Sequence, residues 1–570
     1  MKSGPVWFAC LLSLGCNMSA HAEAPQSYPA LVKAYFDGEW RASPTSATSA
    51  GLHDWDSQLD DVSAAAQARE IARLTDTLAR LRAVNGATLS PMDRDDRDIL
   101  AARIDGQLLQ EQTVQQWRHN PAVYVDLMTG AVYSLIERDF APLPDRMRNV
   151  VARENRIPVM LADAKRNLEN MPSVFVDIAL ENLDGAASFL GKDVPGAFAD
   201  VKDEALKAQL TASTKSALAA VADYKAFLVA QKSNAHGDFR LGRNNLQRLL
   251  ASDMVTVPVE RVLAAGQAQL AKDRAAFLAT EKVIDPANPS GALAMVEADH
   301  PDGAHLISTA RDQLEGLQRF IEEHHIVTLP SQMLSTVAET PAFARALVFG
   351  ELDPPGALET HATKAYYFIT PPDPSWSKAE QDKYLGYFNT ALLQNLSVHE
   401  ALPGHFVQYL YARANPGWSM IRKTGQSYTA TEGWAHYSEQ MMLDEGLGNG
   451  DPKLRLTQLQ DALLRDCRLV ASLQMHTGHM TLPEATTMME QQCFQPASVG
   501  PKEARRGTAD PGYFSYTLGK LEILKLRDDV QKKEGASFTI AHFHDRFLSA
   551  GLIPIAMIRR EMLGTDGPAL

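Results

Sequence analysis

The chain contains the stretch His399-Glu400-Ala401-Leu402-Pro403-Gly404-His405, and Glu432 follows it within Thr431-Glu432-Gly433-Trp434-Ala435-His436-Tyr437. Together these two segments hold the imidazole and carboxylate groups that a divalent metal needs. Such side chains can supply three protein ligands, and one further carboxylate can remove a proton from a water molecule bound to the metal. The two segments therefore predict the centre of a zinc hydrolase.

The spacing of the two histidines departs from the common zinc motif His-Glu-x-x-His. On a regular helix, residues four apart differ by about 40° in direction, whereas residues six apart, such as His399 and His405, differ by about 120°. Pro403 cannot donate a backbone hydrogen bond and disfavours a helical conformation at Leu402, and Gly404 tolerates strained dihedral angles. We therefore predict a kink, bulge or helix end at Pro403-Gly404 that brings His405 back towards His399.

The signature His-Glu-x-x-Pro-Gly-His, followed by Glu-Gly-Trp-Ala, resembles that of the bacterial domain-of-unknown-function 885 family. Members of that family look in turn like remote relatives of the gluzincin peptidases, in which two histidines and a later glutamate hold zinc. The resemblance covers roughly the whole mature chain and is most specific from Lys364 onward. It implies one zinc ion per chain, with His399, His405 and Glu432 as ligands and Glu400 as the general base.

The segment around Glu432 leaves a second ligand set open. Glu432, His436 and Glu439 are spaced so that a helix would present all three on one face. His436 is then either a rival ligand, used with His399 and Glu432 in place of His405, or a partner that orients a ligand. The simpler interpretation is a surface histidine beside the glutamate one turn before it.

Hydrolysis of an amide also needs a donor aimed at the developing oxyanion. Tyr516, with Lys520 one turn later, is the first candidate for that role. Arg468 and His476 lie on one face of the helix expected from about Lys453, where a cationic face can bind a substrate carboxylate. The alternative is that Arg468 and its neighbour Arg465 form internal ion pairs that brace helices.

A β-prone stretch, residues 364–370, contains Tyr366 and Tyr367. These tyrosines either mark the edge strand that binds a peptide backbone in zinc peptidases or are packed aromatic side chains.

The composition indicates a folded protein with a large core, because 45% of the 570 residues are hydrophobic and 22% are charged. The net charge of -14 disfavours nucleic acid as a partner. The only long apolar run is N-terminal, so no transmembrane segment is expected in the mature chain. The sequence does not indicate an oligomeric state.

The N-terminal run is typical of a secretory signal peptide over residues 1–22. Lys2 gives the positive start, Val6 to Leu14 the apolar part and Ala20-His21-Ala22 the cleavage site. We therefore expect a periplasmic or secreted protein cleaved near Ala22. Cys16 faintly resembles a lipoprotein acceptor, but Ser13 stands where leucine is preferred, so the soluble form is favoured.

Two cysteines, Cys467 and Cys493, would remain in the mature chain, and a disulfide between them is possible in an oxidising compartment. Cys467 lies within an apolar helical stretch beside Arg468. We favour a buried free thiol at this position.

Nearly every segment has helical periodicity, as in the apolar face formed by Leu206, Leu210, Leu218, Val221 and Leu228. The expected fold is mainly α: a large two-lobed, gluzincin-like body with a small β-sheet beside the active-site helix. Residues 23–330 would form an N-terminal helical lobe and residues 331–570 the lobe with the metal site.

The expected function is that of a secreted zinc metallopeptidase that hydrolyses short peptides. A metal-dependent amidase or esterase acting on non-peptide substrates would use the same metal site. A catalytically silent metal-binding protein would lack the general base, yet Glu400 is present.

Overall fold

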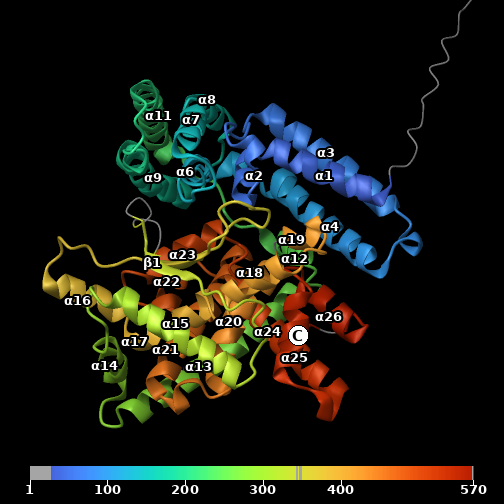
Figure 1. Ribbon diagram of the computed structural model, residues 1–570, viewed down its shortest axis with the longest axis vertical. Coiled ribbons are helices and arrows are strands. Elements are labelled where there is room, and N and C mark those ends of the chain that lie inside the picture. The colour runs from blue at the N-terminus through green and yellow to red at the C-terminus, as the bar shows by residue number, and fades with distance from the viewer. Residues whose placement is uncertain (1–26, 342–344, 346–348, 426, 568) are drawn as a thin grey trace, which may run out of the picture.

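A computed structural model describes residues 27–341, 345, 349–425, 427–567 and 569–570. The expected signal peptide and Cys16 lie outside these residues. The described chain is predominantly helical with one small three-stranded sheet, as expected (Figure 1). Among its helices, none combines the length and the apolar character needed to cross a membrane.

The first helices form two groups at one end of the molecule (Figure 1). The N-terminal group comprises α1 (Tyr28–Ala42), α2 (Pro44–Ala50), α3 (Ala64–Ala83) and α4 (Pro91–Leu109). Beside it lie α6 (Ala122–Tyr133), α7 (Leu143–Glu154), α8 (Ile157–Asn167), α9 (Ser173–Ser188) and α11 (Glu204–Gln231). The apolar face predicted for α11 is confirmed, because Leu206, Leu210, Val221 and Leu228 are buried and Leu218 is partly buried.

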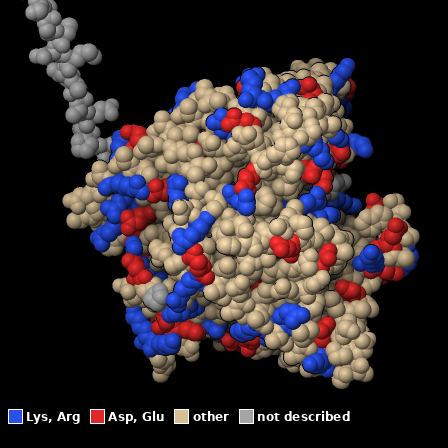
Figure 2. Space-filling model, turned by 180° about the vertical axis from the view of Figure 1, so that it is seen from behind, with Lys and Arg blue, Asp and Glu red and all other residues tan. Residues whose placement is uncertain are grey.

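The helices from residue 242 onward form the larger body that carries the candidate site. Those before the sheet are α12 (Gly242–Ser252), α13 (Val259–Ile284), α14 (Ala292–Glu297) and α15 (Leu306–Glu323). Those after it are α16 (Lys378–Tyr387), α17 (Thr390–Glu400), α18 (His405–Ala414), α19 (Met420–Lys423), α20 (Tyr428–Asp444), α21 (Pro452–His476), α22 (Leu482–Gln491), α23 (Gly500–Ala509), α24 (Ser515–Glu534), α25 (Ile540–Ser549) and α26 (Ile555–Leu563). On the face shown in Figure 2, positive and negative side chains are interspersed between large uncharged areas.

Three hydrophobic cores show how these helices associate. One core runs from Val62 to Ala235 and belongs to the group around α6 to α11. A second joins helices α1, α3 and α4 to α15 and the helices that carry His399, His405 and Glu432. A third joins α12 and α13 to α21 and α22. Helices α12 to α15 therefore pack with helices from the C-terminal half of the chain.

The sheet has the strand order β1-β3-β2. Its central strand β3 (Tyr366–Ile369) pairs parallel with β1 (Thr336–Glu339) and antiparallel with β2 (Gly350–Asp353). The suggestion that Tyr366 and Tyr367 mark an edge strand is therefore wrong, because both neighbours of β3 are occupied. Tyr367 is a packed aromatic residue whose hydroxyl lies 3.3 Å from the Ser397 hydroxyl in α17. The edge strand beside α17 is β2.

Cys467 and Cys493 form a disulfide, so the expectation of a free thiol at Cys467 is wrong. Cys467 lies inside α21 and Cys493 follows the end of α22. The two helices pack together, which brings the two Cα atoms to 6.4 Å, within the usual range for a disulfide. Helical periodicity correctly placed Cys467 in the core but did not show which element faces it.

Candidate metal centre

The two histidines of the motif lie on different helices. Helix α17 ends at Glu400 and α18 begins at His405, with Ala401 (φ -117°, ψ -81°) and Gly404 (φ -68°, ψ -131°) outside helical geometry. The Leu402–Pro403 peptide bond is cis. The predicted interruption at Pro403-Gly404 is confirmed, and it lets two residues six apart face the same point.

Close backbone packing holds this break together. The N–H of Gly404 donates to the carbonyl of Val398 at 3.0 Å, and a Cβ on Gly404 would lie 1.8 Å from the carbonyl oxygen of His399. The φ of Gly404 is negative, so the glycine is needed for its lack of a side chain and not for a left-handed conformation. The buried indole N–H of Trp434 donates to the carbonyl of Pro403 at 2.8 Å and ties the break to α20.

The segment Glu432-Gly433-Trp434 fixes the position of α20. A Cβ on Gly433 would lie 2.5 Å from the Cα of Gly519, and one on Gly519 would lie 2.0 Å from the carbonyl oxygen of Thr429. Helices α20 and α24 can cross this closely only because both positions are glycine. This close crossing positions α20 so that Glu432 faces the histidines and Trp434 contacts Pro403.

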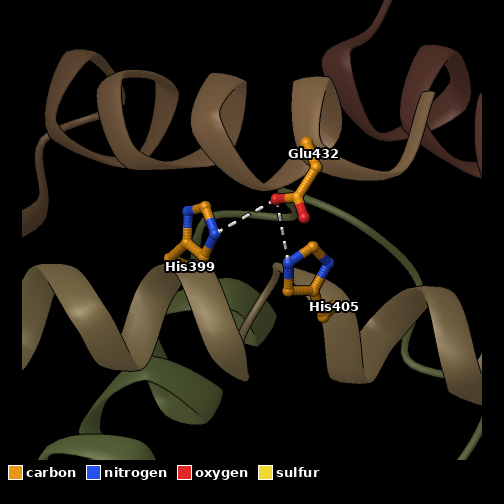
Figure 3. Close-up of side chains that lie close together, drawn as sticks. All are labelled: His399, His405 and Glu432. Atoms are coloured by element: carbon orange, nitrogen blue, oxygen red, sulfur yellow. Dashed lines mark ion pairs between the residues drawn. The ribbon is translucent and has the colours of Figure 1, made fainter. Parts of the chain in front are cut away.

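Three side chains converge at this point (Figure 3). Oε2 of Glu432 lies 3.7 Å from Nε2 of His399 and 3.5 Å from Nε2 of His405. One ligand atom from each residue can be chosen so that all three lie within 4.8 Å of one another. Oε2 of Glu432 is buried and has no hydrogen-bond partner in the described part of the chain.

The arrangement fits a zinc ion. In a tetrahedral site with bonds of about 2.0–2.1 Å, neighbouring donor atoms lie roughly 3.3–3.5 Å apart, close to the two separations observed. Two imidazoles and one carboxylate also leave the fourth position open, as in catalytic zinc sites. The orphaned oxygen of Glu432 would gain a cation as its partner.

Further partners orient the histidines. Nδ1 of His399 lies 2.6 Å from Oε1 of Glu439, and Nδ1 of His405 lies 3.1 Å from Oε1 of Gln408. Because Nδ1 is engaged in both rings, Nε2 of each is directed towards Glu432. Sequence reasoning assigned no role to Glu439 or Gln408, although both share a helix face with a ligand.

His436 does not belong to the cluster. Its Nδ1 lies 3.2 Å from Oε2 of Glu439, the carboxylate that also holds His399. His436 is fully buried, so it is not the surface histidine of the simpler interpretation. The structure brings together His399, His405 and Glu432, and His436 lies behind this cluster in contact with Glu439.

The electrostatics of the cluster favour a bound cation. Burial acts to raise the pKa of Glu432, but the two imidazoles outweigh it and hold this pKa well below its usual range. Burial acts to lower the pKa of His399, yet Glu432 and Glu439 raise it to about 10. In the metal-free protein the positive charge of protonated His399 therefore balances negative charge on Glu432 and Glu439. A metal ion can replace the proton on His399.

We expect the affinity for zinc to rise with pH. A ligand nitrogen must lose its proton to bind the metal, and the raised pKa of His399 keeps that proton in place through the neutral range. Each proton released on binding should strengthen the affinity by about tenfold per pH unit. Competition with a chelator at pH 6, 7 and 8 measures this slope. A dissociation constant that does not change with pH would contradict the ligand assignment.

Glu400 is fixed beside the cluster by the sheet. Its Oε2 accepts a hydrogen bond of 2.9 Å from the backbone N–H of Leu352 in edge strand β2. Its Oε1 makes no hydrogen bond within the described residues, and the Glu400 charge acts on the pKa of His405. A carboxylate held by one oxygen and open at the other can accept a proton from a reactant.

Tyr516 lies next to the cluster of His399, His405 and Glu432. Its ring is stacked on that of His399 with 6.5 Å between the centroids. Burial, followed by the charge of Glu432, raises the pKa of Tyr516 to about 12. The hydroxyl therefore keeps its proton at neutral pH and can donate a hydrogen bond to a developing oxyanion.

Arg468 and His476 are engaged within the protein. The guanidinium of Arg468 donates hydrogen bonds to both carboxylate oxygens of Glu503 at 2.8 and 3.0 Å. Arg468 therefore forms an internal ion pair, which was the alternative to substrate binding. The ring of His476 contacts backbone groups through both nitrogens: Nδ1 accepts from the N–H of Leu241 at 3.4 Å, and Nε2 donates to the carbonyl of Gly507 at 3.0 Å. Burial lowers the pKa of His476 to about 4. These contacts leave neither residue available for a substrate carboxylate.

The candidate centre opens onto a cleft of about 780 Å³. His405, Glu432 and Leu352 line its floor, and residues from α1, α2, α4 and α6 line its opposite wall. The cleft therefore lies where the N-terminal helices meet the helices of the metal cluster.

Comparisons with known proteins place the chain in a family. Residues 44–562 match the family described as "Bacterial protein of unknown function (DUF885)". The chain is similar to the structure described as that of "a putative lipoprotein of unknown function" from Shewanella oneidensis, with 26% identity and a TM-score of 0.80, covering 94% of this chain and all (100%) of the other. It also resembles the "putative lipoprotein" from Colwellia psychrerythraea, with 18% identity and a TM-score of 0.81, covering 95% and 99% of the two chains. No curated protein matches the sequence.

Proposed function

The chain belongs to the DUF885 family, and we propose that it is an exported zinc-dependent hydrolase of gluzincin type that cleaves short peptides. The observation that supports this most strongly is the convergence of His399, His405 and Glu432 beside the separately held carboxylate of Glu400. A site that served only to bind a metal would not require that fourth group.

The three ligands would hold the ion, and neighbouring residues keep the ligand side chains in position. Zinc bound there supplies Lewis acidity, which lowers the pKa of a water molecule towards about 7 and polarises a carbonyl group. Glu439 and Gln408 keep the Nε2 atoms of the two histidines pointed at the site. Trp434 and Gly404 preserve the backbone break that brings His405 into reach.

Glu400 moves the proton in the proposed reaction. The hydrogen bond from Leu352 fixes Oε2, so Oε1 can accept a proton from the attacking water and pass it to the leaving amine. Tyr516 donates its O–H to the oxyanion, because its raised pKa keeps it protonated. Among the described residues β2 has no strand on its outer side, so an extended peptide can lie along the part of that edge not taken by the contact between Leu352 and Glu400.

A first test concerns the metal. We expect the purified, metal-loaded protein to contain about one zinc ion per chain, because the described residues form one such ligand cluster. Removing the ion with a chelator should abolish hydrolysis, and adding zinc back should restore it. Elemental analysis that finds no stoichiometric metal in folded protein under normal loading conditions would refute the proposal.

A second test concerns the substrate. The zinc-loaded protein is incubated with a mixed peptide library and, in parallel, with non-peptide amides and esters, and the products are identified by mass spectrometry. Cleavage within the peptide library supports a peptidase. Cleavage confined to the non-peptide compounds would instead assign the same site to an amidase or esterase.

The proposed location depends on residues outside the described part of the chain. The signal peptide over residues 1–22 supports export, and two structurally similar proteins are described as putative lipoproteins. Those descriptions make Cys16 a candidate for lipid attachment in this chain as well. Metabolic labelling with palmitate, with Cys16→Ala as the control, distinguishes an anchored protein from the soluble form.

A further inference from the structure

Arg506, in α23, is a largely exposed cation whose one ion pair among the described residues is long. Its nearest carboxylate oxygen among the described residues is that of Asp510 at 3.9 Å, and 54% of its side chain is exposed. Three neighbouring arginines form ion pairs with carboxylates of this chain. Arg468 pairs with Glu503 at 2.8 Å, Arg505 with Glu181 at 2.5 Å, and Arg465 lies 3.4 Å from Glu439.

A series of aromatic contacts connects Arg506 with the metal ligands. The Cζ atom of Arg506 lies 4.9 Å from the ring centre of Tyr513, and that of Arg468 lies 4.7 Å from the same ring. Arg468 also lies 5.3 Å from the ring of Tyr516, which is stacked on His399. Stacking fixes the plane of a guanidinium while its N–H groups stay free at the edge, as the binding of a carboxylate requires.

Arg506 lines a cavity that neighbours the cleft of the candidate centre. Arg506 and Asp510 line a cavity of about 640 Å³ between α23 and helices α6 and α9. Asp126 of α6 lines both this cavity and the cleft that contains His405 and Glu432. The two spaces therefore share a wall residue on α6, and a ligand that reached Arg506 from the cleft would have to pass Asp126.

We propose that Arg506 binds a free carboxylate of the substrate and thereby selects peptides whose C-terminus lies close to the bond that is cleaved. The proposal rests on the proposed hydrolase function and names its substrate class. A charge-assisted, two-point contact with guanidinium is specific for a planar carboxylate. It would give the enzyme the specificity of a dipeptidase or carboxypeptidase, the role for which Arg468 and His476 are unavailable.

The test measures binding separately from hydrolysis. The zinc-loaded full-length protein carrying Glu400→Gln is titrated by calorimetry with acetylated dipeptides that have small, aromatic or charged C-terminal residues, and with the same dipeptides as C-terminal amides. We expect the acids to bind about tenfold to a hundredfold more tightly than the amides. Adding Arg506→Met should remove this preference, whereas Arg506→Lys should retain part of it.

Arg505→Met is the matched control, because Arg505 is adjacent, lines the same cavity and already has Glu181 as its partner. This variant should keep the preference for acids. A preference that survives Arg506→Met would mean that the metal or another group holds the carboxylate, and it would overturn the proposal. Equal binding of acids and amides, or no binding of either, before Arg506 is changed would also overturn it.

Hydrolysis assays distinguish a failure of the Arg506 proposal from a failure of the hydrolase proposal. In the enzyme with Glu400 intact, Arg506→Met should raise KM for peptides that end in a free C-terminal carboxylate. It should leave the cleavage of peptides with a C-terminal amide nearly unchanged. If the intact enzyme hydrolyses nothing while the Arg506-dependent preference persists, the hydrolase assignment fails and the carboxylate site stands.

Discussion

Glu400→Gln should lower the rate of hydrolysis by about 10²–10⁴-fold, the usual contribution of a general base, while zinc content stays near one ion per chain. Glutamine has nearly the same shape as glutamate, and its amide oxygen can still accept the hydrogen bond from the N–H of Leu352. The side chain should therefore stay in place and lose only its ability to take up a proton. Activity and metal content are measured on the same preparation.

Glu432→Gln provides the contrast. Glu432 supplies the carboxylate oxygen that faces both histidines, so its replacement should weaken zinc binding as well as activity. Loss of zinc from both variants alike would show that Glu400 is a ligand and that the general base has been assigned wrongly. Full activity of Glu400→Gln would exclude it from proton transfer.

Gly404→Val should reduce the affinity for zinc by at least the 10- to 100-fold that is typical when the support of a ligand is removed. A Cβ at this position would lie 1.8 Å from the carbonyl oxygen of His399, and a backbone atom cannot move aside without displacing that ligand. His405, the next residue, would move with it. Zinc affinity is measured by competition with a chelator, and folding is checked by circular dichroism.

Gly417→Val is a suitable control, because a Cβ on Gly417 would meet no atom within 4 Å. It introduces the same side chain shortly after α18, so a general effect of valine on the chain would appear there too. Ala401→Val is a less clean comparison, since Ala401 is fully buried. If Gly404→Ala and Gly404→Val both bind zinc as tightly as the unchanged protein, the break does not position His405.

The sequence predicted the break in the ligand-bearing helix because the cause is local. Proline cannot continue the hydrogen-bond pattern, and a regular helix cannot direct residues six apart to one point. The sequence pointed to Gly404 for its tolerance of unusual dihedral angles. The structure adds a second requirement, the carbonyl group of His399 packed against it. Such close approach is a property of the folded backbone and leaves no trace in the residue type alone.

The identities of the partners depended on long-range packing. Periodicity placed Arg468 on one helix face with His476, but only the fold showed that Glu503 of α23 lies opposite Arg468. Strand propensity identified β3, but only the sheet order showed that β2 is the edge. Arg506 drew no attention in the sequence, because an exposed arginine in a helix is ordinary until neighbouring cations are seen to be paired.

The sequence by itself determined the helical character of the chain, the two segments that carry His399, His405 and Glu432, and the interruption between the histidines, because ligand chemistry and the restrictions of proline act over a few residues. The tertiary structure decided that His436 lies behind the ligands, since the close crossing at Gly433 and Gly519 sets how α20 faces the broken helix. It also decided the disulfide, the edge strand and the surroundings of Arg506, because each depends on which distant segments become neighbours when the cores form.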